Sequence, residues 1–287
     1  MSCPLCAHSK SRPSWLGSTV YLGEEFRYVE CLSCKSLYCD PMPDGKTLER
    51  MYGPEYHDLF HAQENMGGTS GVTEVLSWLR REGRGKFVDY GCGAGHLLHA
   101  AKLAEWNAIG IEFEENVATR ISQRIGVPVI TDTAELLNRP ADVLHLGDII
   151  EHLTELDRQM PEILRLLKIG GLLLAQGPLE NNANLFKLGV KIGRQLRRGQ
   201  ATEMAPYHVL LTTAEGQRRL FRRFGLHELK YSISEAAWPA PAKIMFDDLA
   251  HPRSVGLYFL RRCSQALSAM RPHSWGNRYF YAGRRMT

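Results

Sequence analysis

Short apolar runs alternate with longer amphipathic stretches over residues 86–176. Apolar runs bounded by turn residues are typical of buried strands, whereas apolar positions three and four residues apart are typical of helices. The expected order is strand 86–90, helix 96–106, strand 108–112, helix 116–125, strand 127–131, helix 134–137, strand 142–146, helix 156–167 and strand 171–176. This alternation predicts an α/β fold, in which βαβ units build a doubly wound, mostly parallel sheet.

The rhythm changes after residue 178. A basic helical stretch at 182–200 precedes a helix at 212–225, which Thr212 and Glu215 open as a capping box. Strands at 226–233 and 277–283 then enclose residues 238–275, which contain a helix of their own. We expect an N-terminal module with its linker at 1–66 and a main domain at 67–287, with a cap segment at 179–211 and an insertion at 238–275.

Composition limits the class of protein. The chain has 287 residues, 44% of them hydrophobic, which is enough for one large core and a smaller module. The formal net charge of +4 does not by itself indicate a nucleic-acid partner. The start MSCPLCAHSK has no apolar signal-peptide core, and no stretch approaches the roughly 20 apolar residues of a membrane helix. We therefore expect a cytoplasmic protein without a membrane span.

Four of the seven cysteines form two CxxC pairs near the N-terminus, Cys3 with Cys6 and Cys31 with Cys34. Four thiolates at this spacing are the ligands of a tetrahedral structural zinc site, so we predict that residues 1–66 hold a small zinc-ribbon-like module with one Zn²⁺. The pattern departs from the usual knuckle at Ala7 and Lys35, which stand where a glycine often follows the second cysteine.

The stretch FVDYGCGAGHLLHAA is the candidate ligand-binding turn of the main domain. Gly91, Gly93 and Gly95 connect a strand to a helix N-terminus, a turn whose bare backbone approaches a nucleotide-type ligand closely. Glu112 ends the next strand, where a carboxylate accepts the ribose hydroxyls of an adenosine. Dinucleotides and S-adenosylmethionine compete for such a site. Asp89 would repel a pyrophosphate, so it favours S-adenosylmethionine.

Five ordered stretches resemble class I S-adenosylmethionine-dependent methyltransferases: VDYGCGAG, IGIEF, TDTAEL, DVLHLGDIIEHL and RLLKIGGLLLAQGP. The resemblance implies a Rossmann-like sheet of seven strands, the last two antiparallel. It also implies which residues touch the cofactor. The methionine part is expected near Asp89, Gly91, Cys92 and Gly93, the ribose near Glu112, and the adenine near Phe113, Asp132 and Thr133, with Leu146 in the wall of the cofactor site. For Phe113 an ordinary core position is the alternative.

The N-terminal stretches CPLC, CLSC, YCDPMP and MYGPEY resemble a subgroup of these enzymes that carries a zinc knuckle before the catalytic domain. Members often methylate small molecules, including sugars, in the biosynthesis of glycans and natural products. The resemblance implies a small-molecule acceptor and leaves open whether the methyl group goes to O, N or C.

Two segments offer catalytic side chains. Asp148, Glu151 and His152 follow the fourth strand, where strand ends face the ligand crevice. His152 is a candidate base or a residue that orders the loop. Quinone-pathway O-methyltransferases use E-x-x-E-H here for a divalent cation. We expect Mg²⁺ less in this chain, because Asp148 is shorter than glutamate. His208, with Tyr207 beside it, resembles the family's H-x-x-x-[ST] motif and is the preferred base.

Basic residues gather in the cap segment and the helix after it, and they would suit a phosphate-bearing substrate or form a solvated helix face: Lys187, Lys191, Arg194, Arg197, Arg198, Arg218, Arg219, Arg222 and Arg223. Two alternatives remain, an RNA methyltransferase and a non-enzymatic scaffold that binds the cofactor. Against RNA, the sequence has no dedicated RNA module, and Gly147 and Asp148 stand where many amino-group methylases of nucleic acids carry Pro-Pro-aromatic. The oligomeric state is not readable from the sequence.

Overall fold

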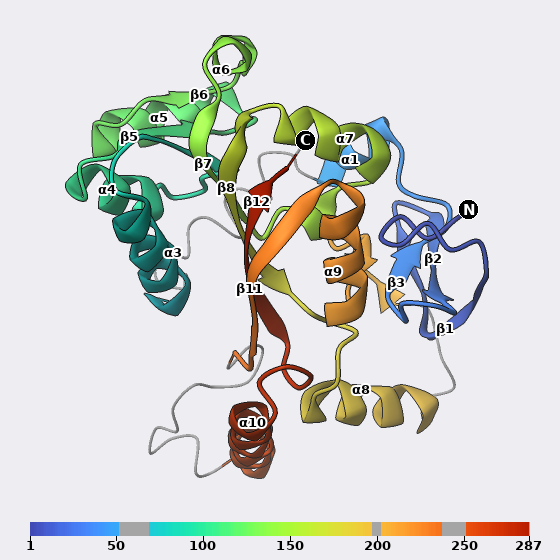
Figure 1. Ribbon diagram of the computed structural model, residues 1–287. Coiled ribbons are helices and arrows are strands. Elements are labelled where there is room, and N and C mark those ends of the chain that lie inside the picture. Colours follow the sequence, from blue (N-terminus) through green and yellow to red (C-terminus); the bar gives the residue numbers. More distant parts are fainter. Residues whose placement is uncertain (52–68, 197–201, 237–250, 287) are drawn as a thin grey trace. The chain divides into compact units, whose positions relative to one another are not determined.

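The computed structural model describes residues 1–51, 69–196, 202–236 and 251–286 (Figure 1). The chain divides into two compact units, each built from segments that are distant in sequence. We call one the sheet unit, Pro43–Gly177 with Phe221–Lys230 and Phe280–Thr287. We call the other the knuckle unit, Met1–Met42 with Pro178–Leu220 and Tyr231–Tyr279.

The large sheet has seven strands in the order β11-β12-β8-β7-β4-β5-β6. Its central pairs, β8 with β7, β7 with β4, β4 with β5 and β5 with β6, are parallel. The strands are β4 (Lys86–Tyr90), β5 (Asn107–Ile111), β6 (Val129–Ile130), β7 (Ala141–Gly147), β8 (Leu167–Pro178), β11 (Leu226–Ser234) and β12 (Arg278–Arg285). The α/β fold expected from the alternating pattern and the Rossmann-like sheet of seven strands implied by the resemblance are both confirmed.

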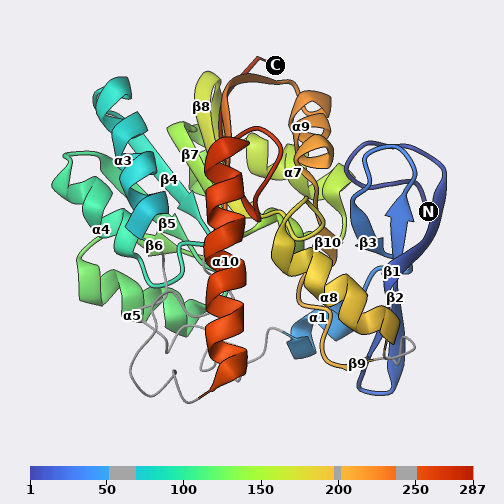
Figure 2. The ribbon, with the colours of Figure 1, turned by 90° about the horizontal axis from the view of Figure 1, so that it is seen from below.

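Helices cover both faces of this sheet. Figure 2 shows α3 and α4 on one side and α7 on the other. The helices of the sheet unit are α1 (Gly45–Met51), α3 (Thr69–Glu82), α4 (His96–Leu103), α5 (Glu115–Ile125), α6 (Ala134–Asn138), the 3-10 turn Ile150–His152 and α7 (Leu156–Leu164). Each falls within a few residues of an apolar periodicity in the sequence, because one stripe of each helix must be buried against the strands.

The core between α3, α4 and the sheet is made by alternate residues of the central strands. Phe87 of β4 and Val143 of β7 point to this face and pack with Leu98 of α4 and Leu79 of α3, all four fully buried. Side chains two residues apart on a strand share a face. Asp89 and His145 therefore continue the same two rows toward the carboxyl ends of the strands.

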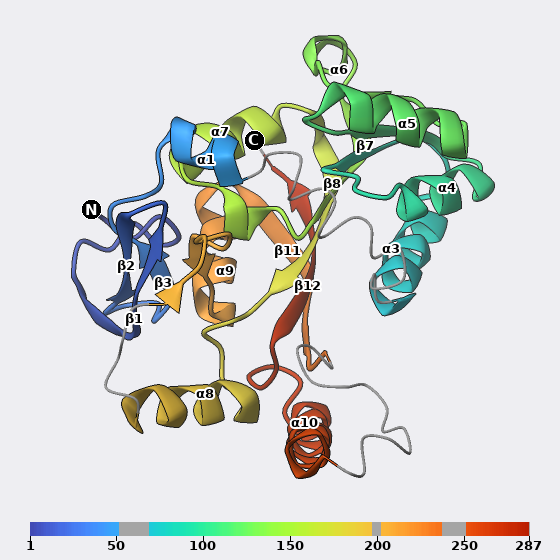
Figure 3. The same cartoon turned by 180° about the vertical axis from the view of Figure 1, so that it is seen from behind.

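The knuckle unit contains a second sheet of five strands in the order β10-β3-β2-β1-β9. Its strands are β1 (Ser11–Tyr21), β2 (Glu24–Cys31), β3 (Leu37–Cys39), β9 (Thr202–Glu203) and β10 (Leu210–Leu211). Leu22 and Gly23 join β1 to β2 with φ of 52° and 82°, the positive values of a tight hairpin turn. Helix α8 (Leu185–Leu196) lies beside β1 (Figure 3).

The two units divide the sequence differently from the expected boundary at residues 66 and 67, which lies outside the described residues. Residues 1–42 group with residues 178–220 because β3 pairs with β10, Tyr38 opposite Leu210 and Leu37 opposite Leu211. The expected cap segment therefore supplies two strands to the N-terminal sheet. Such a pairing between distant segments leaves no local signal in the sequence.

The start of helix α9 (Ala214–Arg223) corrects one prediction. The helix was expected to open with Thr212 and Glu215 as a capping box. Instead, Thr213 Oγ1 accepts the backbone N–H of Gly216 at 3.1 Å, and Thr212 Oγ1 donates to the carbonyl of Pro178 at 3.0 Å. Two threonines in a row both fit the motif, and tertiary hydrogen bonds decide which of them caps the helix.

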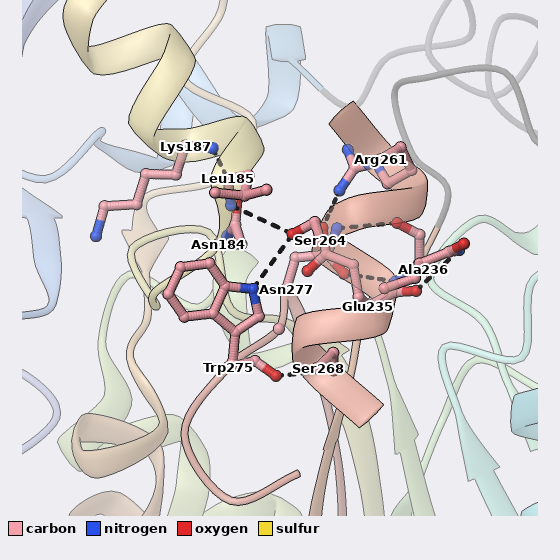
Figure 4. Close-up of polar contacts among 12 residues, drawn as sticks. Asn184, Leu185, Lys187, Glu235, Ala236, Arg261, Ser264, Ser268, Trp275 and Asn277 are labelled. Carbon is pink, nitrogen blue, oxygen red and sulfur yellow. Dashed lines mark hydrogen bonds and ion pairs between the residues drawn. The ribbon is translucent and has the colours of Figure 1, made fainter. Parts of the chain in front are cut away.

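The expected insertion contributes helix α10 (Pro252–Met270), while residues 237–250 lie outside the described part. A polar cluster fastens this helix (Figure 4). Arg261 and Glu235 form an ion pair whose side chains are 1% and 0% exposed. Ser264 Oγ accepts the backbone N–H of Leu185 at 3.2 Å and Trp275 Nε1–H at 3.3 Å. Helix α10 is thus tied to α8 and to the end of β11.

Candidate active site

The glycine turn lies between β4 and α4. Gly91, Gly93 and Gly95 have φ of 70°, 50° and 72°, the left-handed region in which a side chain is strained. The amide of Gly91 donates to the carbonyl of Ile111 at 2.9 Å, which ties the turn to the end of β5. Gly95 is the N-cap of α4, and no side chain of the described residues caps the helix there. The first amides of α4 are therefore available to a ligand at this edge.

Two carboxylates lie at the same edge of the sheet. Asp89, 3% exposed, is opposite Gly110 in the β4 and β5 register, and Glu112, 6% exposed, follows β5 directly. A Glu112 oxygen accepts the backbone N–H of Phe113 at 2.9 Å. Asp89 Oδ1 lies 2.7 Å from Nδ1 of His145. The structure thus brings together the glycine turn and both acids that the sequence singled out.

Three residues expected around the adenine lie in different surroundings. Phe113 is 69% exposed and meets the ring of Tyr90 edge-on, with ring centroids 5.6 Å apart, which rules out the alternative of a core aromatic. Asp132 Oδ1 accepts the backbone N–H of Ala134 at the start of α6 at 2.9 Å. Thr133 is the N-cap residue of α6.

Two further cofactor candidates are buried. Leu146 is fully buried near the carboxyl end of β7. Cys92 is 8% exposed, and burial raises the pKa of its thiol. Gly110 leaves the space that this thiol occupies, since a Cβ on Gly110 would lie 2.8 Å from Cys92 Sγ. These residues can line a site and offer no charged group to it.

The segment after β7 carries three candidate side chains. Asp148 has a φ of 53° and its amide donates to the carbonyl of Gln176 at 2.9 Å, which holds the loop against the end of β8. Glu151 is 2% exposed and His152 is half-buried, whereas Asp148 is exposed. Within the described residues, Asp148 joins no group of three ligands whose atoms lie within 4.8 Å of one another.

The preferred base, His208, lies in the knuckle unit just before β10. Its Nδ1 is 2.9 Å from Glu180 Oε2, and both side chains are 35% exposed. The hydroxyl of Tyr28 donates to the carbonyl of His208 at 2.9 Å and fixes the backbone there. Tyr207 lines a shallow hollow of about 520 Å³ beside the β1–β2 turn.

Sequence reasoning missed Glu180. It lies 28 residues before its partner, in a loop after β8, and no spacing or periodicity connects the two. The two segments lie side by side, because the neighbouring Asn181 donates its backbone N–H to the carbonyl of Thr212 at 3.0 Å. A carboxylate hydrogen-bonded to one ring nitrogen fixes the tautomer of a histidine and leaves the other nitrogen to accept a proton.

The four paired cysteines meet as predicted, and their sulfur atoms lie within 4.8 Å of one another. Cys3 and Cys34 sulfurs are 3.7 Å apart and those of Cys6 and Cys31 are 3.6 Å apart. A disulfide would place them at about 2.05 Å. A tetrahedron with metal–sulfur bonds of about 2.3 Å has edges of about 3.8 Å, so the donor set fits zinc. The hydrogen bond from Cys3 lowers the pKa of Cys34 below its usual value.

The two knuckles have the same backbone geometry. The amide of Ala7 donates to the carbonyl of Cys3 at 2.8 Å, and that of Lys35 donates to the carbonyl of Cys31 at 3.1 Å. Ala7 and Lys35 have φ of 58° and 61°. Both adopt the left-handed conformation in which glycine is common, so the substitutions noted in the sequence leave the knuckle shape intact at a cost in strain.

The second knuckle also supports helix α9. Thr213 Oγ1 donates to the carbonyl of Cys34 at 2.7 Å, and the amide of Thr213 donates to Ser36 Oγ at 3.0 Å. Arg219 Nη1 donates to Ser33 Oγ at 2.6 Å. A Cβ on Gly216 would lie 2.2 Å from Ser36 Oγ. The start of α9 is thus built directly on the cysteine cluster.

Several side chains of the expected basic face already interact with other groups of the protein. Arg218 stacks over the ring of Tyr231, Arg219 also pairs with Glu215, and Arg223 pairs with Asp157. Burial lowers the pKa of Lys187 to about 8, and its ammonium donates to the carbonyl of Asn181. Arg197 and Arg198 lie outside the described residues. Three of the α9 arginines therefore already have protein partners.

Comparison with known proteins decides the family. Residues 66–230 match the family model described as a methyltransferase domain. The chain is a class I S-adenosylmethionine-dependent methyltransferase. No curated protein sequence matches this methyltransferase.

Several solved structures resemble the methyltransferase at low sequence identity. A possible histamine N-methyltransferase from Thermotoga maritima has 18% identity and a TM-score of 0.49, over 84% of this chain and 98% of that one. The N-methyltransferase NodS from Bradyrhizobium japonicum, in complex with S-adenosyl-L-homocysteine, has 11% identity and a TM-score of 0.44, over 84% and 97%. The magnesium protoporphyrin IX methyltransferase from Synechocystis PCC 6803 has 13% identity and a TM-score of 0.45, over 84% of this chain and 93% of that one.

In residues 1–51, 69–196, 202–236 and 251–286, no helix is long and apolar enough to cross a bilayer.

Proposed function

We propose that this methyltransferase transfers a methyl group to a small molecule, a sugar or another secondary metabolite, at a hydroxyl or an acidic carbon. The observation that carries the proposal is the Glu180–His208 pair, whose facing atoms lie 2.9 Å apart. An acceptor of this kind must lose a proton during methyl transfer, and a histidine oriented by a carboxylate is suited to remove it. Cysteines left as free thiols agree with a cytoplasmic enzyme.

The glycine turn and the two acids would hold the methyl donor. S-adenosylmethionine supplies a methyl group on a positively charged sulfur. In our proposal Asp89 accepts hydrogen bonds from the amino group of the methionine part, and Glu112 accepts those of the ribose hydroxyls. The backbone at Gly93 and Gly95 lies near the methionine end, and the exposed ring of Phe113 lies against the adenine. Cys92, Asp132, Thr133 and Leu146 complete the lining.

We assign the base to His208. Its Nδ1–H donates to Glu180, so that Nε2 carries the lone pair which takes the proton of the acceptor. The Glu180 carboxylate then stabilises the imidazolium that forms. Tyr207 would hydrogen-bond the acceptor, and Glu151 with His152 is the second candidate pair for the same task. We propose no step through Mg²⁺.

The second cofactor we propose is one structural Zn²⁺ held by Cys3, Cys6, Cys31 and Cys34. The spacing of the four sulfur atoms supports it. When bound, the ion would supply folding energy to the knuckle unit and no chemistry. Thr213 and Arg219 connect α9 to the same cysteine cluster. Loss of the metal should therefore destabilise α9 as well as the N-terminal residues.

We favour a small molecule over RNA as the acceptor. RNA binding needs free cations along a groove and aromatic side chains for stacking. Arg218, Arg219 and Arg223 are already engaged with protein groups, which weakens the case for a basic RNA-binding face. A phosphate on the small molecule would be met by the remaining cations of α8 or by Arg222 of α9.

Transfer of a labelled methyl group tests the proposal. The enzyme is incubated with labelled S-adenosylmethionine and a metabolite extract, with and without ribonuclease. We expect label in a small product, and a loss of at least tenfold in rate in His208→Ala and Glu180→Gln. His227→Ala, at an exposed histidine of β11, is the matched control and should keep the rate. Label found only in RNA, and lost with ribonuclease, would contradict the proposal.

A further inference from the structure

A buried histidine lies against the acid that we assign to the methionine end of the cofactor. Nδ1 of His145 on β7 is 2.7 Å from Oδ1 of Asp89 on β4, and the two residues are each 3% exposed. They are direct neighbours in the parallel register of the two strands. Histidine is an unusual choice here, because this face of the sheet is otherwise lined by apolar side chains such as Phe87 and Val143.

The sheet makes room for this imidazole. A Cβ on Gly147 would lie 2.7 Å from Cε1 of His145, so the absence of a side chain at Gly147 lets the ring lean toward the carboxyl end of β7. The ring also lies near Phe87, with centroids 6.5 Å apart. The imidazole is therefore confined by its neighbours, and its hydrogen bond to Asp89 has a fixed direction.

The other ring nitrogen of His145 bears on which nitrogen carries the hydrogen. Nε2 of His145 is buried and has no hydrogen-bond partner among the described residues. A proton added there would be a buried positive N–H without an acceptor, which costs more than an unpaired lone pair. The geometry thus favours the neutral tautomer with its hydrogen on Nδ1, donated to the carboxylate.

We infer that His145 is a positioning residue, which holds the ionised carboxylate of Asp89 in the orientation that receives the amino group of the methyl donor. The inference rests on the proposed role of Asp89 in cofactor binding. A neutral donor suits this task, because it fixes one carboxylate oxygen and leaves the negative charge to attract an ammonium group. An arginine or lysine at the same place would cancel that charge.

The test compares two ligands that differ only beyond the thioether. S-adenosylhomocysteine carries the amino acid end, whereas 5′-methylthioadenosine lacks it. In His145→Leu the fixed donor is lost, so we expect the dissociation constant of S-adenosylhomocysteine to rise about tenfold to hundredfold. The constant of 5′-methylthioadenosine should stay within about twofold. Calorimetric titration of the full chain, prepared with zinc, gives both values.

Two conservative variants separate positioning from packing. The side-chain amide of His145→Asn can reach the place of Nδ1 and should recover most of the affinity for S-adenosylhomocysteine. His145→Gln places its amide near Nε2 instead and should not. This pair also serves if His145→Leu fails to fold. His99→Leu, at an exposed histidine of α4, is the control for the loss of an imidazole and should leave both constants unchanged.

Equal weakening of both ligands in His145→Leu, or no weakening of either, would overturn the inference, as would equal binding by the asparagine and glutamine variants. A wild-type protein that binds neither ligand would instead refute the proposed cofactor site itself. The two failures are therefore distinguishable.

Discussion

Replacing Gly95 by alanine tests whether helix α5 packs against the bare backbone of the glycine turn. The residue has a φ of 72°, and a Cβ there would lie 2.8 Å from Cδ1 of Ile125 and 2.9 Å from Cγ2 of Ile121. Alanine would thus meet two penalties, a strained backbone and contact with two side chains of α5. Gly170 is the matched control, because its φ is 77° and no atom in the described part of the chain lies within 4 Å of the added Cβ.

The two penalties have different sizes. Alanine in the left-handed region costs about 1–2 kcal/mol, and the smaller entropy of its unfolded chain returns about 0.4–1 kcal/mol. Gly170→Ala should therefore lower the free energy of unfolding by about 1 kcal/mol. Crowding in a packed interior adds about 1–3 kcal/mol. For Gly95→Ala we expect a loss of about 2–4 kcal/mol.

Urea unfolding of the zinc-loaded protein, followed by circular dichroism, measures the difference. The double variant Gly95→Ala with Ile125→Val removes the methyl group 2.8 Å from the new Cβ, so it should be less destabilised than the sum of the two single changes. Equal losses in Gly95→Ala and Gly170→Ala, or strict additivity in the double variant, would refute the claim that α5 packs against the bare backbone of this turn.

Three further predictions concern the cysteine cluster. Metal analysis should find one zinc per chain, and its removal by a chelator should lower the melting temperature; an unchanged melting curve after complete removal would contradict a structural role. Lys35→Gly should raise the free energy of unfolding by about 0.5–1 kcal/mol, because glycine relieves the strain of a φ of 61°. The control Ala100→Gly in helix α4 should lower the free energy of unfolding by about 1 kcal/mol. A lower free energy of unfolding in both variants would show that Lys35 is not strained. Gly216→Ala, whose Cβ would lie 2.2 Å from Ser36 Oγ, should speed the loss of zinc to a chelator. Gly189→Ala in α8, with its nearest neighbour at 4.0 Å, should not. Equal rates of zinc loss in the two variants would contradict the claim that the start of α9 supports the cysteine cluster.

The features that the sequence predicts well are local. The strands and helices of residues 86–178 follow from apolar periodicity, because each element buries one face against its neighbour. The turn from Asp89 to Gly95 and the acid Glu112 are predictable because parallel strands end at one edge of a sheet. The cysteine cluster follows from paired spacing, and the structure confirms that the four thiols meet.

The features that the sequence does not reveal depend on distant pairing. Glu180 and His208 are separated by a helix, and β3 pairs with a two-residue strand far along the chain. The exposure of Phe113 is equally hidden, since an aromatic residue after a strand is as often buried. In the sequence, His145 is a polar residue within an otherwise apolar strand. Only the register with β4 shows that it lies beside Asp89.

Cofactor binding at the glycine turn and Glu112 is the central claim, and one titration tests it most directly. S-adenosylhomocysteine is titrated calorimetrically into the zinc-loaded wild-type protein, Glu112→Gln, and Glu115→Gln as the exposed control on α5. We predict one site per chain, affinity at least tenfold weaker in Glu112→Gln, and affinity within about twofold of wild type in Glu115→Gln. Absence of binding heat with the wild-type protein, or equal affinity in the two variants, would contradict the account.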